Sequence, residues 1–178
     1  MVASSPLLNL TFVLGGAASG KSAFAEGLVM ATGRPRIYIA TSQVYDDEMA
    51  RKVADHQTQR GGGWHTVEEP YNIAKALRDV TADHVVLIDC ATLWLTNHLL
   101  AEHDLAAETT AFLDAIAACP APVVVVSNET GLGIVPDNAL ARRFRNAQGK
   151  LNQQIAAQAD LVVFIAAGLP LVMKGQLP

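Results

Sequence analysis

The sequence predicts an α/β fold in which a doubly wound, mostly parallel sheet carries helices on both faces. Strand-like and helix-like segments alternate along the chain, which is the order that βαβ units produce. The strand-like segments are near-continuous runs of valine, isoleucine and leucine, as expected where helices cover both faces of a parallel sheet. The expected strands are residues 8–14, 36–40, 84–89, 122–127 and 160–166.

Helical stretches are expected between these strands. The first, 19–31, follows a glycine-rich loop, and the second, 46–60, opens with three acidic residues, which suit the positive end of a helix. The others are 72–79, an interrupted stretch over 93–118, and 138–158. The last stretch spaces its apolar residues at three- and four-residue intervals, which predicts a core-facing stripe of Leu140, Phe144, Ala147, Leu151 and Ile155.

Composition indicates one globular domain over residues 1–178. The 178 residues are 51% hydrophobic and 17% charged, which supports a sizeable core and excludes intrinsic disorder. The net charge of −4 gives no bulk electrostatic argument for nucleic acid as a partner. The longest apolar stretch, 161–173, is too short for a transmembrane segment. Cys90 and Cys119 lack metal-ligand spacing, so we expect reduced thiols in a cytoplasmic protein.

A phosphate-binding loop follows the first expected strand. It fits the pattern G-x-x-x-x-G-K-[ST] between a buried strand and a helix, the context that this motif requires. Its backbone amides and Lys21 would bind the phosphates of ATP or GTP, and the Ser22 hydroxyl would hold Mg²⁺. The alternative is a glycine-rich turn that binds nothing. The loop residues are Gly15, Gly16, Ala17, Ala18, Ser19, Gly20, Lys21 and Ser22.

A second ligand for the metal is expected at the end of a later strand. Asp89 ends the apolar run VVLID, where it would face the crevice that holds the phosphates. The alternative is an acid that caps the following turn. We therefore predict a Mg²⁺ site made by Ser22 and Asp89.

Two further segments carry charged residues with open interpretations. On a helix, Lys52, His56 and Arg60 share one face, and the cations would favour a neutral, nucleophilic imidazole at His56. A solvated helix face explains the same spacing. Glu68 and Glu69 end a short extended segment, and the alternative there is an exposed acidic pair.

The segment after the fourth expected strand combines an unusual loop with a basic helix. Two glycines and a proline shape residues 128–136 at the ligand-binding edge of the sheet. The helix that follows carries Arg142, Arg143 and Arg145, which either neutralise a transferred phosphate or form a solvated face.

The whole pattern resembles a known family. The motifs GGAASGKS, YIATSQ, DDEMARKVADHQTQR, LIDCATLWLTN and SNETGLGIVPDNALARRFRNAQGKLNQ occur in the order found in the bifunctional adenosylcobinamide kinase/adenosylcobinamide-phosphate guanylyltransferases of cobalamin biosynthesis. The resemblance implies a recombinase-like P-loop NTPase-type fold. It implies phosphorylation of adenosylcobinamide by ATP or GTP, followed by transfer of GMP from GTP through a GMP–histidine intermediate, giving adenosylcobinamide-GDP and pyrophosphate. Some members of the family are trimers, so a homo-oligomer is expected.

The same resemblance assigns individual residues. The nucleophile maps to His56, and His65 is a weaker competitor. Besides the phosphate loop with its catalytic Lys21, the implied nucleotide contacts are Ala40, Thr41, Ser42, Gln57, Thr58, Gln59, Arg60, Glu68 and Asp89. Two departures from the family pattern are Ala18, where arginine is common, and Asp89, which replaces a glutamate of some relatives. Two other functions stay open: a single-activity P-loop kinase of small molecules, and a GTP-sensing regulatory module.

Overall fold

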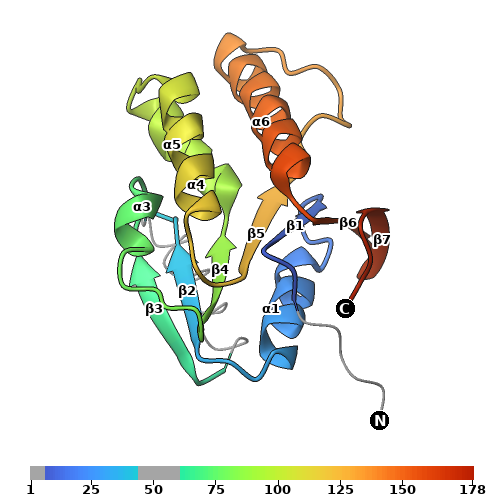
Figure 1. Cartoon of the computed structure of the whole chain (residues 1–178). Helices are drawn as coiled ribbons and strands as arrows, with labels where there is room; N and C mark the ends of the chain where they lie inside the picture. The colour runs from blue at the N-terminus through green and yellow to red at the C-terminus, as the bar shows by residue number, and fades with distance from the viewer. Residues whose placement is uncertain (1–6, 44–60) are drawn as a thin grey trace.

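A seven-stranded sheet organises the chain (Figure 1). The computed structural model describes residues 7–43 and 61–178, and the expected helix 46–60 lies outside them. The strand order is β3-β2-β4-β5-β1-β6-β7, with every pair parallel except β6 and β7. The strands are β1 Leu10–Gly15, β2 Arg36–Ala40, β3 Trp64–Glu68, β4 Val85–Asp89, β5 Val123–Asn128, β6 Leu161–Ala166 and β7 Leu169–Lys174.

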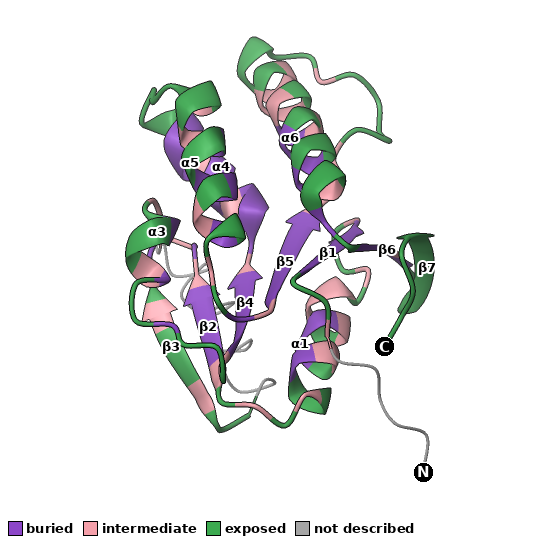
Figure 2. Cartoon of the chain, viewed as in Figure 1, coloured by how far each residue is buried: buried purple, intermediate pink, exposed green. Residues whose placement is uncertain are grey.

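Helices cover both faces of the sheet, as predicted. On one face, α1 packs through Ala25 and Val29 against valines and leucines of β1, β4 and β5. On the other face lie the helices that follow β3, β4 and β5, and the four central strands between the layers are almost wholly buried (Figure 2). The described helices are α1 Lys21–Ala31, α3 Ile73–Ala76, α4 Ala91–Leu100, α5 Leu105–Ala117 and α6 Ala139–Gln158.

The predicted strands are all confirmed, within one or two residues at their ends, and the expected break in 93–118 separates α4 from α5. The break has local causes. Glu102 adopts a left-handed conformation with φ 57°, which ends α4, and the Asp104 carboxylate accepts the amides of Ala106 and Ala107 to begin α5.

Three expectations need correction. The first helix begins at Lys21 rather than at residue 19, because Gly20 has φ 93°, which a right-handed helix does not accommodate. Leu140 is 53% exposed instead of core-facing, since the first turn of α6 extends beyond the sheet (Figure 1). The stretch after Gly168 was not expected to be a strand, yet it forms β7, an exposed antiparallel edge strand. Across the described ranges, no helix has the length and apolarity to cross a membrane.

Candidate nucleotide site

The carboxyl ends of five parallel strands bring the predicted site residues to one edge of the sheet. Ala40 of β2 is in register with Glu68 of β3 on one side and with Asp89 of β4 on the other. Gly15 of β1 is in register with Asn128 of β5. This edge is where open α/β sheets bind their ligands, so the register supports the predicted location of the site.

The loop between β1 and α1 is built to receive an anion. The N-terminus of α1 has no acidic residue in its first turn, and no side chain caps it, so its amides carry unopposed partial positive charge. The Lys21 ammonium donates to the Gly16 carbonyl at 3.1 Å, which folds the cation over the loop. Within residues 7–43 and 61–178, Ser19 Oγ is buried and has no hydrogen-bond partner, so its hydroxyl can bond a phosphate oxygen.

Glycine is required where this loop begins. A Cβ atom on Gly15 would lie 2.5 Å from Ser19 Oγ and 2.7 Å from the carbonyl oxygen of Ile165, both closer than real contacts allow. The turn between β6 and β7 adds support from outside, because the Gly168 amide donates to the Ser19 carbonyl at 2.8 Å. The curvature of the phosphate loop is therefore held by β6 as well as by its own glycines.

Thr41 holds the end of β2 against the end of β4. Its buried hydroxyl donates to the Cys90 carbonyl at 2.7 Å and accepts the Cys90 amide at 2.8 Å. The Asn97 side chain donates to the Thr41 carbonyl at 2.8 Å. The hydroxyl of Thr41 thus fixes the backbone just after Asp89, while its neighbours Ala40 and Ser42 remain half-buried at the edge.

Lys21 and Asp89 both lie at the carboxyl edge of the sheet. Lys21 begins α1 directly after the phosphate loop, and Asp89 ends β4, which is separated from β1 by β5 alone. Burial, together with the charge of Asp89, raises the pKa of the Cys90 thiol to about 12, and the charge of Lys21 acts in the opposite direction. The fold thus brings an ammonium group and a carboxylate to the same edge as the phosphate loop.

The two acids at the end of β3 have different environments. Glu68 is exposed at the edge, in register with Ala40. Glu69 is buried: its carboxylate accepts the amides of Tyr71 and Asn72 and pairs with Lys75 at 3.0 Å. The alternative of an exposed acidic pair is therefore wrong for Glu69, which fixes the turn that leads into α3.

A buried polar network at the end of β5 was missed by the sequence analysis. Ser127 Oγ donates to Asn152 Oδ1 at 2.7 Å, and Gln148 Nε2 donates to both of these atoms at 2.9 Å. Beyond it, Asn128 Oδ1 and Thr130 Oγ1 are buried and have no hydrogen-bond partner in the part of the chain that the structure describes; Asn128 is in register with Gly15 at the start of the phosphate loop. The i, i+4 spacing of Gln148 and Asn152 was the available signal, but nothing in the sequence showed that α6 turns this face to β5.

The structure explains one of the three arginines that the sequence analysis singled out on α6. Arg142 donates to the carbonyls of Pro136 and Asp137 at 2.9 and 2.7 Å, so it closes the loop that precedes α6. Arg143 is exposed and Arg145 is half-buried. A role for these two in neutralising phosphate remains a prediction.

Several predicted residues lie outside the described residues: His56, Gln57, Thr58, Gln59 and Arg60. His65, the competing histidine, is exposed on β3. The described part of the site therefore comprises the phosphate loop, the strand ends at Ala40, Glu68 and Asp89, and the segment after β5.

Comparison with solved structures defines the class of protein. The flagellar accessory protein FlaH from Methanocaldococcus jannaschii matches with a TM-score of 0.54 at 12% identity, over 98% of this chain and 84% of that one. An ATPase from a type III secretion system matches with a TM-score of 0.51 at 10% identity, over 92% of this chain and 56% of that one. With the sheet order and the phosphate loop, these matches confirm a P-loop NTPase-type α/β fold.

Sequence comparison identifies the family within this class. Residues 11–173 match the family model for cobinamide kinase / cobinamide phosphate guanyltransferase. The chain is 45% identical over 167 residues to the bifunctional adenosylcobalamin biosynthesis protein CobP of Pseudomonas aeruginosa, covering 92% of this chain and 96% of that protein. It is 38% identical over 181 aligned positions to the bifunctional adenosylcobalamin biosynthesis protein CobU of Escherichia coli, covering 93% of this chain and 99% of that protein. The chain belongs to the cobinamide kinase / cobinamide phosphate guanyltransferase family.

Proposed function

We propose that this protein phosphorylates adenosylcobinamide with ATP or GTP and then transfers GMP from GTP to the product, giving adenosylcobinamide-GDP and pyrophosphate. The observation that carries the proposal is that the phosphate loop with Lys21 and the strand end with Asp89 share the carboxyl edge of the sheet, in a chain of this family. The two alternatives are a kinase with a single activity and a GTP sensor. No described feature of the site favours either of them over the proposed function.

In the kinase step, the loop amides and Lys21 hold the β- and γ-phosphates and stabilise the charge that develops on the transferred phosphoryl group. The hydroxyl oxygen of the aminopropanol arm forms a bond to the γ-phosphorus. The bond from that phosphorus to the nucleoside diphosphate breaks, and the hydroxyl proton is released to solvent. We propose that Asp89, half-buried at the end of β4, either holds the metal through water or orients the attacking hydroxyl.

In the transferase step, an imidazole nitrogen of His56 attacks the α-phosphorus of GTP and expels pyrophosphate. The phosphate of the phosphorylated substrate then attacks the same phosphorus, the N–P bond breaks, and protonation makes the imidazole a good leaving group. Covalent catalysis divides a difficult exchange between two anions into two displacements. Support for His56 comes from its place in the family motif, since it lies outside the described residues.

The residues present suit Mg²⁺ bound with the nucleotide. The Ser22 hydroxyl in the first turn of α1 and the Asp89 carboxylate are hard oxygen donors, the type that Mg²⁺ prefers alongside phosphate oxygens. When bound, the ion would neutralise charge on the phosphates. We propose Ser22 and Asp89 as its protein ligands. Further nucleotide contacts in the proposal are Ala40, Thr41, Ser42, Glu68 and residues 57–60.

GTP labelled on the α-phosphate tests the transferase step. Wild-type protein should acquire an acid-labile, alkali-stable label, and His56→Ala should acquire none, whereas the matched control His65→Ala should label like the wild type. Label retained by His56→Ala would contradict the assignment.

A second assay separates the remaining functions. Transfer of label from the γ-phosphate of ATP or GTP to adenosylcobinamide should occur in wild type and in His56→Ala but fail in Lys21→Ala. Kinase activity without any α-label on the wild type would identify a single-activity kinase. Nucleotide binding with neither reaction would identify a sensor.

A further inference from the structure

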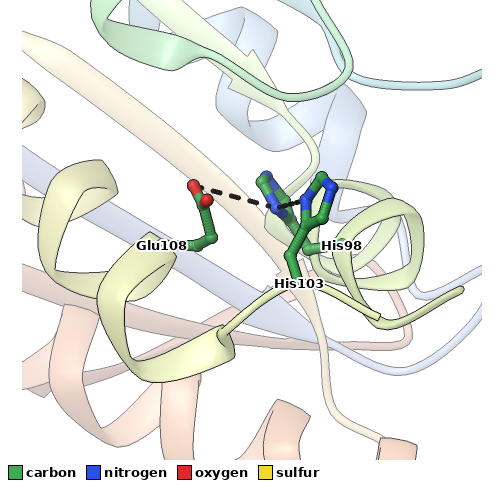
Figure 3. Close-up of side chains that lie close together, drawn as sticks. All are labelled: His98, His103 and Glu108. Atoms are coloured by element: carbon green, nitrogen blue, oxygen red, sulfur yellow. Dashed lines mark hydrogen bonds and ion pairs between the residues drawn. The ribbon is translucent and has the colours of Figure 1, made fainter. Parts of the chain in front are cut away.

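A second cluster of potential ligand side chains lies where α4 meets α5. His98 near the end of α4, His103 in the connecting segment and Glu108 in α5 place three potential ligand atoms within 4.8 Å of one another (Figure 3). His98 Nδ1 lies 2.9 Å from His103 Nδ1 and 3.8 Å from Glu108 Oε2. Figure 3 shows all three side chains pointing toward one another. The proposed function uses none of them.

These distances fit a small metal ion. Zinc binds imidazole nitrogen and carboxylate oxygen at about 2.0–2.2 Å, so two ligands of a tetrahedral ion lie about 3.3 Å apart. The separations of 2.9 and 3.8 Å from His98 Nδ1 bracket this value, and all three ligand atoms lie within 4.8 Å of one another. Two histidines and one glutamate are also a ligand set that zinc uses when a fourth position stays open for water or another ligand.

The surroundings of His98 prepare it as a ligand. The imidazole is 2% exposed, and its Nε2 lies 3.3 Å from the Tyr71 carbonyl oxygen. Donation of Nε2–H to this carbonyl leaves the lone pair on Nδ1, the atom that faces His103 and Glu108. The ring is further held by Trp94, with centroids 4.5 Å apart, and by Tyr71 at 5.2 Å. A carbonyl that orients a histidine in this way is the usual outer partner of a metal ligand.

Space for a fourth ligand lies beside the cluster. The three side chains line a cavity of about 250 Å³ together with Tyr71, Trp94 and Phe112. His103 is exposed and Glu108 is half-buried, so an ion can enter from solvent without unfolding.

We propose that His98 Nδ1, His103 Nδ1 and the Glu108 carboxylate form a binding site for a divalent transition metal of the Zn²⁺ class, with an exchangeable fourth position that faces the cavity. The ion would join the end of α4, the connecting segment and the first turns of α5. None of the three residues is among the proposed nucleotide contacts, so the site does not depend on the proposed function.

Zn²⁺ titration against a chromophoric chelator tests the site, with tag-free, metal-stripped full-length protein. Wild type should bind one equivalent that His103→Ala and Glu108→Gln bind at least about tenfold more weakly. Both positions are at least partly exposed, so these variants avoid the folding risk of replacing buried His98. His65→Ala removes an exposed histidine outside the cluster and should bind zinc like the wild type.

Two measurements on the same variants complete the test. Co²⁺ should give the intense visible absorption of a four-coordinate ion with wild type and not with His103→Ala. Zn²⁺ should raise the melting temperature of the wild type more than that of His103→Ala, because an ion that binds only the native state stabilises it. Superimposable zinc titrations of wild type, His103→Ala and Glu108→Gln would overturn the proposal. The close approach of His98 and His103 would then be explained by a hydrogen bond between the two rings.

Discussion

Replacing Thr41 with valine should destabilise the protein substantially, although the two side chains have nearly the same shape. Thr41 is fully buried, and its hydroxyl both donates to and accepts from the backbone of Cys90. In Thr41→Val the Cys90 carbonyl keeps one partner, the Trp94 amide at 3.2 Å, whereas the Cys90 amide loses its partner.

The magnitude follows from these two losses. An orphaned buried amide costs about 1–3 kcal/mol, and the lost bond to a carbonyl that keeps another donor costs about 0.5–1.5 kcal/mol. The free energy of unfolding should therefore fall by about 2–4 kcal/mol. Urea denaturation followed by circular dichroism measures it, and an unchanged m-value would show that the unfolding transition itself is the same.

Thr110→Val is the matched control. The Thr110 hydroxyl donates to the Ala106 carbonyl at 3.0 Å on the exposed face of α5, where water replaces the lost bond. That substitution should change stability by no more than about 0.5 kcal/mol. Equal effects of the two substitutions would refute the argument that Thr41 fixes the β2–β4 edge through buried hydrogen bonds.

Three further predictions follow from single groups. Burial raises the pKa of Cys90 to about 12 and also raises the pKa of Cys119. In the native protein, a thiol reagent at pH 8 should therefore leave buried Cys90 unmodified and label half-buried Cys119 slowly. Denaturant should expose both thiols to rapid labelling. Burial alone would raise the pKa of Glu69, but its backbone donors and Lys75 overcome this effect and lower the pKa. The carboxylate therefore stabilises the protein above the pKa that Glu69 has in the unfolded chain, and this stabilisation is lost as pH falls through the lower pKa of the folded state. Glu69→Gln should be less stable than the wild type by about 1–2 kcal/mol at pH 7, and urea titrations at pH 7 and pH 3 should show a smaller difference in acid. Gly15→Ala should cost about 1–3 kcal/mol and weaken GTP binding measured by calorimetry, whereas Gly16→Ala, with open space around its new Cβ, should change stability little.

The parallel sheet could be predicted because its signal is local. Runs such as VVVV over 123–126 are apolar on both faces, and only a strand between two helix layers has that requirement. The phosphate loop is also local, since its glycines, lysine and serine lie within eight consecutive residues. Asp89 could be predicted as a site residue because it ends such a run, and the carboxyl ends of parallel strands are where ligands bind; its role there stays a prediction.

Interactions between distant segments could not be predicted in this way. Ser127, Gln148 and Asn152 form a network across 25 residues of sequence, and no local pattern connects the end of the strand with the two helical residues. The exposed strand β7 contains Pro170 and follows Gly168, both of which disfavour strands in sequence, yet an edge strand tolerates a proline whose missing amide needs no partner. His98 and His103 carry no familiar spacing, so only the meeting of α4 and α5 revealed their cluster.

Helix α4 connects the hydrophobic core to the strand ends at the nucleotide edge. It begins directly after the β4 end that carries Asp89, and Thr92 in its first turn accepts the Asn128 amide at the end of β5 at 2.8 Å. Five residues later, Asn97 donates to the carbonyls of Thr41 and Pro70, which lie just after the ends of β2 and β3. Three strand ends are therefore positioned by one helix, and Trp94, which is 1% exposed, anchors that helix in the core. The polar residues of α4 are buried because they hold the edge in register, which is why this helix lacks the amphipathic pattern of α6.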